Sequence, residues 1–454
     1  MVIVDESAGT LKRSLAKTQL SPFAQGMLLR LVLTFMMRQG RMSCSNAAGA
    51  IASQAIHRSQ LTRFLARPRW QKQDFNAPLR QALLNLESQN GRFLFLIDAT
   101  LISQAGQKTQ NTYSTGNRKR RPKKGRRYSP RKIKRKNVHS FTFGLLITPS
   151  GIRIPFQRPH YTKKYCEEQG LVHQSTAEMA AAMIRNLPLP EGADVVVLGD
   201  TAYEAKVVQA ACQERGFLWI FPANPERVYA GPAGERPKLR SRLQEWTELS
   251  QQTIKLRAST GPYAEYRRLS RWRVGLKQKP RVYYAYQEKQ EVRNVGRVQL
   301  VFSTMKPNLK KATPDDVKIL LSNARTMSVR ELIELYSLRW QIELFFKELK
   351  STLGLAQYRF QNFQAVEGWV NVAITTVLFL EQLRASKLRD RRLCAERKQW
   401  WQRQRLHGLT IAYREECAGK ELTLISKRLQ TPGGIHKLKQ LISASIPKEY
   451  RTNP

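Results

Sequence analysis

The chain has 454 residues, 41% of them hydrophobic, which is enough apolar material for roughly two to four domains rather than one core. It carries 78 Lys and Arg residues against 34 Asp and Glu residues, a formal net charge of +44. Self-repulsion on that scale destabilises a compact chain unless a polyanion offsets it, which favours nucleic acid as the partner. An anionic membrane surface is the competing partner. However, the cations are spread along the chain and no stretch of 18 uncharged apolar residues is present, so we expect no membrane association.

The cysteines indicate a reducing compartment. Cys44, Cys166, Cys212, Cys394 and Cys417 are far apart, with no Cys-x2-Cys pair among them. We therefore expect neither a disulfide framework nor a zinc site, and a cytoplasmic location fits. The first ten residues contain acids and lack an apolar core, so we expect no signal peptide.

Residues 1–75 predict an N-terminal helical domain. Helices are expected at residues 23–37, 43–52 and 57–65. The last has an apolar side with Leu61, Phe64 and Leu65, as in a helix-turn-helix with a polar recognition helix. A plain helical hairpin with a solvated basic face is the alternative. The candidate DNA contacts are His57, Arg58, Gln60 and Arg63.

Residues 76–221 alternate between strand and helix patterns. Three early strands, a helix, a strand and another helix follow the order of a ribonuclease H-like fold, so this stretch is expected to be the first part of an α/β catalytic core. Strands are expected at residues 93–97, 140–147, 153–156, 195–198 and 217–221, and helices at 77–89, 175–186 and 203–216.

A basic run lies between the first two predicted strands. Thirteen of the nineteen residues from 118 to 136 are Lys or Arg. Such a run repels itself and could be mobile or mimic a nuclear localisation signal. Its position near the first strand favours contact with DNA phosphates through Arg120, Arg121, Lys123, Lys124, Arg126 and Arg127.

The second half of the chain predicts three further regions. Residues 222–310 are expected to form an inserted, mostly antiparallel sheet with strands at 265–274, 281–286 and 297–304. Residues 311–360 complete the catalytic core with a buried strand at 317–322 and a helix that Ser328 and Glu331 open as a capping box. Residues 361–454 are expected to be a helical region for dimerisation or DNA contact, in which Trp369, Trp400 and Trp401 either pair two copies or form core.

Three carboxylates carry the expected chemistry. Asp98 and Asp200 each follow an apolar run, at residues 93–97 and 195–199, and Glu343 lies in the predicted helix. Acids at the ends of buried strands are destabilising unless cations offset them. Carboxylate oxygens suit Mg²⁺, for which Mn²⁺ can substitute, and a pair of such ions can drive phosphodiester cleavage and strand transfer without a covalent intermediate.

A helix from residue 328 onward would align the polar groups around Glu343. If it is continuous, Tyr336, Arg339, Glu343 and Lys350 share a strip about 60° wide beside an apolar stripe. Trp340 flanks that strip, where it could stack on an unpaired base or pack under the β insertion as core. An ordinary amphipathic helix with an Arg339–Glu343 pair is the plainer interpretation.

The spacing Tyr336-x2-Arg339-x3-Glu343-x6-Lys350 resembles the signature of bacterial cut-and-paste insertion-sequence transposases of the DDE type. Residues 199–203 look like the second conserved block of that family, and the long stretch before Glu343 resembles its β-strand insertion. The resemblance covers about residues 85–360.

The resemblance implies that Asp98, Asp200 and Glu343 form the catalytic triad of a DNA transposase. It also implies that Tyr336, Arg339 and Lys350 contact the transposon end near the scissile phosphate. The enzyme would bind, cut and join double-stranded DNA ends as a synaptic homodimer in a prokaryotic cell. Trp340 matches a Trp of hairpin-forming relatives, but residues 317–322 lack the aromatic that such relatives often carry, so the resemblance leaves the excision intermediate open.

Two other functions compete. A nuclease or resolvase on the same fold would cut without joining. A catalytically idle DNA-binding protein descended from a transposase would have no need of an intact triad, so the three acids argue against it.

Overall fold

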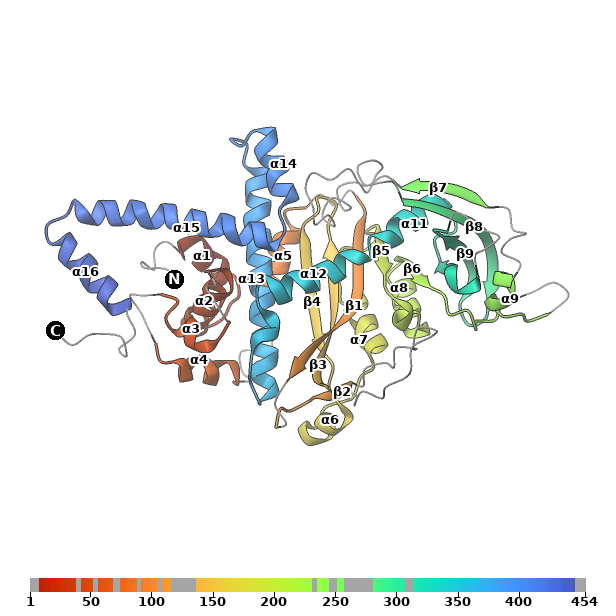
Figure 1. Cartoon of the computed structure of the whole chain (residues 1–454), viewed down its shortest axis with the longest axis horizontal. Helices are drawn as coiled ribbons and strands as arrows, with labels where there is room; N and C mark the ends of the chain where they lie inside the picture. Colours follow the sequence, from red (N-terminus) through yellow and green to blue (C-terminus); the bar gives the residue numbers. More distant parts are fainter. Residues whose placement is uncertain are drawn as a thin grey trace, which may run out of the picture.

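A computed structural model of the chain describes residues 8–37, 42–51, 56–67, 74–87, 91–104, 108–115, 136–230, 235–244, 251–256, 281–306 and 313–445. In this part the protein is mixed α/β, with one large mixed sheet and helices packed on it and beyond one end of it (Figure 1). The predicted strand at residues 265–274 lies outside the described residues. So does the basic run up to residue 135, including Arg120, Arg121, Lys123, Lys124, Arg126 and Arg127.

The described strands form a sheet of ten in the order β2-β3-β1-β5-β6-β10-β9-β8-β7, with β4 paired to β3. β1 pairs parallel with β5 and β5 pairs parallel with β6, and the other described pairs are antiparallel. The strands are β1 (Phe93–Gln104), β2 (Tyr113–Thr115), β3 (Lys136–Ile147), β4 (Arg153–Pro159), β5 (Val195–Leu198), β6 (Leu218–Pro222), β7 (Gln252–Leu256), β8 (Arg281–Val292), β9 (Gly296–Thr304) and β10 (Lys318–Ser322).

The sequence locates the central strands well. The five strands predicted between residues 93 and 221 are confirmed in β1, β3, β4, β5 and β6. All four residues of β5 are buried, as expected for a β-branched run covered on both faces. The strands predicted at 281–286, 297–304 and 317–322 are confirmed in β8, β9 and β10. β10 pairs with β6 on one side and β9 on the other, so the inserted strands extend the central sheet instead of forming a separate one.

The helices around the sheet are α5 (Ala77–Leu84), α6 (Lys163–Gln169), α7 (Thr176–Arg185), α8 (Lys206–Glu214) and α9 (Leu239–Gln244). Of these, α5, α7 and α8 were predicted and differ from prediction at their ends, whereas α6 and α9 were not predicted. The helix predicted from residue 203 begins later because Glu204 is buried and bound outside the helix: it accepts from the backbone N–H of Asn224 at 3.1 Å and pairs with Arg227. Ser328 caps its helix as predicted, accepting from the backbone N–H of Glu331 at 3.2 Å.

The N-terminal helices share a core with the C-terminal helices. α1 (Gly9–Ala16), α2 (Pro22–Met37), α3 (Cys44–Ala48) and α4 (Arg58–Leu65) pack at one end of the molecule, with α2 and α4 against α13 (Phe363–Arg389) (Figure 1). The rings of Phe35 and Trp369 lie 5.0 Å apart, and Ser14 donates to Gln382 at 2.6 Å. Trp369 is fully buried, so it is a core residue and not a pairing surface.

The remaining C-terminal helices extend outward from α13. They are α14 (Ala395–Arg403), α15 (Leu406–Leu429) and α16 (Gly434–Ser445). By length and composition, α13 is the helix among the described residues that could cross a membrane, but 83% of its apolar window is buried inside the protein. It also packs against β4 of the sheet, so it serves here as a core helix.

Candidate active site

Asp98 and Asp200 lie on neighbouring parallel strands. Leu96 of β1 pairs with Leu198 of β5, so the two acids stand two residues beyond the same register position. The prediction that Asp98 ends its strand is wrong, because β1 continues to Gln104 through antiparallel pairing with β3, where Asp98 faces Phe143. Asp98 is therefore held at mid-strand, at the point where the shorter partner β5 has ended.

Asp200 caps the short 3₁₀ turn Thr201–Tyr203, accepting from the backbone N–H of Ala202 at 2.9 Å. This turn buries Tyr203, which is 1% exposed. A Cβ on Gly199 would lie 3.0 Å from the ring of Phe221 and 3.1 Å from Cβ of Tyr203, so a side chain there would require its neighbours to move by a few tenths of an ångström. Burial raises the pKa of Tyr203, and the charges of Asp98 and Asp200 raise it further.

The segment that carries Glu343 is two helices and not the continuous helix that we expected. α11 (Val329–Ser337) ends at a tightened turn, and α12 (Trp340–Ser351) begins after it. Arg339 donates its backbone N–H to Tyr336 at 3.1 Å, an i to i−3 bond of the 3₁₀ kind. Because side chains three apart eclipse in such a turn, Tyr336 and Arg339 stay on the same side. The single strip of four polar residues predicted on one continuous helix is therefore altered, but Tyr336 and Arg339 remain neighbours.

Arg339 bridges two of the three carboxylates. Its Nη1 lies 3.4 Å from Oδ2 of Asp98, and its Nη2 donates to Oε1 of Glu343 at 2.5 Å. The side chains of Asp98 and Arg339 are each 18% exposed and that of Glu343 is 30% exposed. The Arg339–Glu343 pair of the plainer interpretation is thus present, but it also reaches Asp98 on the sheet.

The electrostatics confirm that the acids act on one another. Burial raises the pKa of Asp98 to about 6, with further upward contributions from Asp200 and Glu343. The backbone N–H of Ala99, which donates to Asp98 at 2.8 Å, and the guanidinium of Arg339 oppose that rise. Burial also raises the pKa of Tyr336, on which the charges of Asp200 and Glu343 act. Within the described residues, the ion pairs of these three acids involve one arginine, and the excess negative charge favours an added cation.

The donor set suits a hard divalent cation, because carboxylate oxygens are its preferred ligands. Nevertheless, no group of three or more His, Cys, Asp or Glu side chains in the described residues is gathered closely enough to hold a metal ion. The guanidinium of Arg339 stands between Asp98 and Glu343, where it offsets the charge that a metal would offset. The residues therefore fit the ion in their chemistry, and Arg339 would have to withdraw for them to close on it.

Two further predicted DNA contacts, Lys350 and Trp340, lie on α12 and differ in burial. Lys350 donates to the backbone oxygen of Leu101 at 2.9 Å, and burial lowers its pKa. Trp340 is 53% exposed, which contradicts the alternative in which it is buried as core. Its ring is therefore available at the start of α12, three residues before Glu343.

The N-terminal candidates lie on α4. Leu61, Phe64 and Leu65 are buried as predicted, whereas His57, Arg58, Gln60 and Arg63 are exposed. His57 stands before the helix as its cap, its Nδ1 accepting from the backbone N–H of Ser59 at 3.3 Å. Contact of these residues with DNA stays a prediction.

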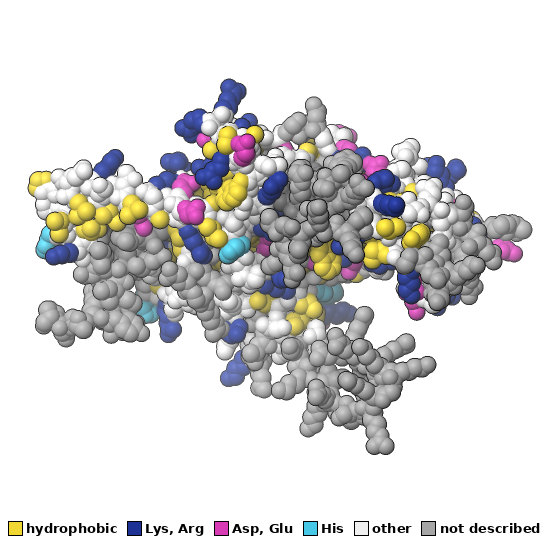
Figure 2. Space-filling view, turned by 45° about the horizontal axis from the view of Figure 1, so that its top comes forward, with side chains coloured by type: hydrophobic (Ala, Val, Ile, Leu, Met, Phe, Trp, Pro, Cys, Tyr) yellow, Lys and Arg dark blue, Asp and Glu magenta, His cyan; other side chains and the backbone are white. Residues whose placement is uncertain are grey.

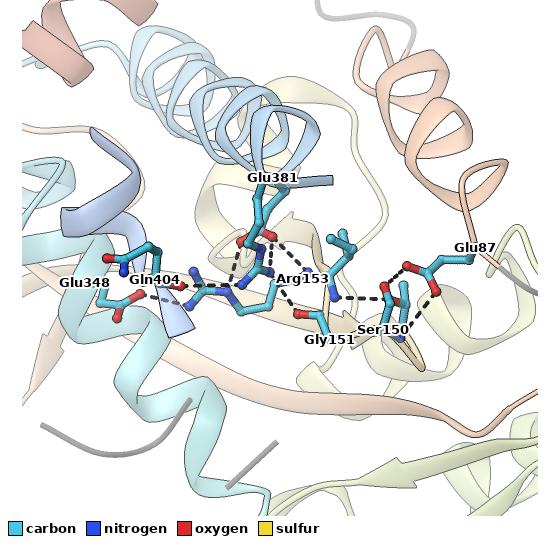
Figure 3. A network of polar contacts seen from close by, with 10 residues as sticks. Glu87, Ser150, Gly151, Arg153, Glu348, Glu381 and Gln404 are labelled. Carbon is cyan, nitrogen blue, oxygen red and sulfur yellow. Dashed lines mark hydrogen bonds and ion pairs between the residues drawn. The ribbon is translucent and has the colours of Figure 1, made fainter. Parts of the chain in front are cut away.

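Sequence reasoning missed a buried ion network at the far end of α12 (Figure 3). Arg153 of β4 donates to Glu348 of α12 at 2.9 Å and to Glu381 of α13 at 3.0 Å. Arg384 also pairs with Glu381, and Arg405 lies 3.7 Å from Glu348. Burial would lower the pKa of Arg153, but Glu381 and Glu348 raise it above its usual value. The network ties α12 to β4 of the sheet, to α13 and to Arg405 at the start of α15.

A signal for this network was present in the sequence. Glu381 directly follows the apolar residues 377–380, and Glu348 stands three residues after the buried Phe345. An acid that ends an apolar run was the same observation that identified Asp98 and Asp200. The pattern shows that such acids need partners, but not whether those partners are arginines or a metal.

Residues 170–379 match the family model for the transposase DDE domain. The match supports a DDE-type transposase. It spans slightly less than half of the chain and includes Asp200 and Glu343, while Asp98 lies before it. No curated protein matches the chain. The large mixed sheet with helices is consistent with a DDE transposase domain, a family that generally uses divalent metals and acts on DNA.

Proposed function

We propose that this protein is a cut-and-paste DNA transposase of the bacterial insertion-sequence type, with Asp98, Asp200 and Glu343 as its catalytic triad. The observation that carries the proposal is that Asp98 and Asp200 follow the same register position on adjacent parallel strands, while Arg339 links Asp98 to Glu343 on α12. The parallel β1-β5-β6 strands beside the antiparallel β3 and β4 support a ribonuclease H-like arrangement of the core.

In this proposal Asp98, Asp200 and Glu343 hold a pair of Mg²⁺ ions, or Mn²⁺ in their place. Bound there, the ions would supply Lewis-acid activation of water or a 3′-hydroxyl and stabilise the leaving oxygen. The contribution of the chain is positional: β1 and β5 fix two acids in register, and the Asp200 cap fixes its carboxylate against Ala202. Tyr203, in the turn that Asp200 caps, is buried, and the charges of both aspartates act on it.

The signature residues then bind the DNA end. Arg339, released from Asp98 and Glu343 when a cation offsets their charge, would be free to pair with a backbone phosphate. Tyr336 lies beside it, and Lys350 is anchored at the other end of α12 on the carbonyl of Leu101. The active form is a homodimer on two ends, because cutting and joining two ends together requires two active sites.

Cleavage and binding assays on each triad variant test the proposal. Asp98→Ala, Asp200→Ala and Glu343→Ala should each abolish Mg²⁺-dependent cleavage of transposon-end DNA and retain the gel shift of that DNA. Full cleavage by any one variant would remove that residue from the triad. A strand-transfer assay separates the transposase from a nuclease or resolvase, which would cut the end without joining it.

A further inference from the structure

The corner between α13 and α15 is rich in cations that lack acidic partners. Residues 389–403, here called the α14 knob, end α13 and include α14, which projects from the edge of the molecule (Figure 1). Lys and Arg side chains gather over this projection in the space-filling view (Figure 2). The cations of the knob that form no ion pair within the described part of the chain are Arg389, Arg391, Arg397, Lys398 and Arg403.

The two acids of the knob do not offset these cations. Asp390 pairs with Arg392 at 3.0 Å and accepts from its backbone N–H at 3.0 Å. Glu396 lies in the first turn of α14, where a negative charge is favoured by the helix dipole. The knob therefore keeps a concentrated positive charge that nothing in the described chain neutralises.

One face of α14 interleaves cations with an aromatic ring. Arg397, Trp400 and Arg403 are three residues apart, so they lie on the same side of the helix. Trp400 is 38% exposed, while its neighbour Trp401 is 9% exposed and packs edge-on against it at 5.1 Å. Lys387 of α13 lies 6.0 Å from the centre of the Trp401 ring. Trp401 thus anchors the knob, and Trp400 remains outside among the arginines.

The knob is joined to the catalytic helix through the buried network of Figure 3. Gln404, which ends α14, accepts from Arg384 at 3.5 Å, and the next residue, Arg405, lies 3.7 Å from Glu348 of α12. A polyanion held by the knob would therefore be held in a fixed relation to α12.

We propose that the α14 knob is a duplex-DNA-binding surface that contacts the phosphate backbone without reading sequence. It is separate from α4 and from the signature residues on α11 and α12, and it rests on the proposed function only in taking DNA as the natural ligand. Unpaired arginines suit phosphate oxygens, and an exposed tryptophan among them can pack on the sugar–phosphate edge.

Binding of a random-sequence duplex at several salt concentrations tests the proposal. The triple variant Arg391→Gln, Arg397→Gln, Arg403→Gln should lower the log–log salt slope by up to about 2.7, since each lost phosphate contact removes about 0.9. The control variant Lys163→Gln, Lys164→Gln, Lys206→Gln removes the same number of exposed charges from α6 and α8 and should leave the slope unchanged. Equal slopes in the knob variant, the control and the wild type would overturn the proposal.

A local readout separates the knob from general loss of charge. The Trp400 signal is the fluorescence of a protein minus that of the same protein carrying Trp400→Phe. Adding the duplex should change this difference signal in the wild type and should leave it unchanged in the knob triple variant. Vesicles of phosphatidylcholine and phosphatidylserine should leave that difference signal unaltered. A response to vesicles but not to DNA would show a membrane surface and overturn the proposal. Because neither assay needs cleavage, an inactive triad would leave this result intact.

Discussion

Two clusters of arginine and carboxylate stand on the same helix and differ in how completely their charges are offset. Glu348, at the far end of α12, lies in a network where Arg153, Arg384 and Arg405 meet Glu348 and Glu381. Glu343, five residues earlier, shares a single arginine with Asp98 while Asp200 stands nearby. The first cluster has more cations than anions, and the second has more anions than cations.

The two clusters also differ in the solvent exposure of their acidic side chains. The side chains of Glu348 and Glu381 are 5% and 0% exposed, whereas those of Asp98 and Glu343 are 18% and 30% exposed. A buried cluster in which both acids pair with arginines fixes the position of a helix and leaves no free acid for a metal ion. A partly exposed cluster with surplus negative charge can exchange its arginine for another cation. We therefore infer that Glu348 holds α12 in place and propose that Glu343, nearer the other end of the helix, takes part in catalysis.

Matched substitutions on α12 give the largest expected contrast. Glu348→Gln leaves buried Arg153 and Arg405 with one acid fewer, so it should lower the free energy of unfolding by about 3 to 5 kcal/mol. Glu343→Gln relieves repulsion among the site acids and should change that free energy by less than about 1 kcal/mol. Urea unfolding of the two variants measures both values. Similar losses in both would contradict the division between the two ends.

Glu367 provides a third case, a partly buried acid that pairs with no arginine in the described part of the chain. The hydroxyl of Tyr161 donates to its carboxyl, and burial raises the pKa of Glu367 from 4.5 to about 7. The folded protein therefore binds this proton more tightly than the unfolded chain does. The resulting stability is complete below pH 4.5 and is lost as the pH rises through 7.

The expected loss between pH 5 and 8 is on the order of 2 to 3 kcal/mol. Glu367→Gln keeps a neutral partner for Tyr161 and should remove this part of the pH dependence. Unfolding of wild type and variant across that range provides the test. Parallel curves would show that Glu367 is charged in the folded protein.

Trp340 gives the smallest expected effect on stability and a selective effect on activity. Its ring is 53% exposed beside Arg339, so Trp340→Ala should barely change the unfolding temperature. Loss of stacking on an unpaired base should impair the step after first-strand nicking by about 1 to 3 kcal/mol. Denaturing gels that resolve nicked, open and covalently closed ends measure each step. Equal loss of nicking would remove the stacking role.

The sequence predicts those features that depend on residues close together in the chain, and it misses those that depend on tertiary contacts. The central strands were predictable because their apolar runs, such as residues 195–198, are read directly from the sequence. The turn at Leu338 and Arg339 was not, because both residues favour helix and the turn accompanies the reach of Arg339 to Asp98 on β1. Glu348 was missed for the same reason: its partners come from β4 and from the start of α15. Local patterns gave the three acids, and only tertiary contacts distinguish a saturated acid from a reactive one.

The central claim is that Asp98, Asp200 and Glu343 close on divalent cations in place of Arg339. Mn²⁺ binding in the presence of transposon-end DNA, followed by electron paramagnetic resonance, tests it most directly. We predict a pair of bound ions in the wild type, loss of this binding in Asp98→Ala, Asp200→Ala and Glu343→Ala, and retention in Glu381→Asp, which preserves the charge of the buried network. Undiminished Mn²⁺ binding in the three triad variants would contradict the claim.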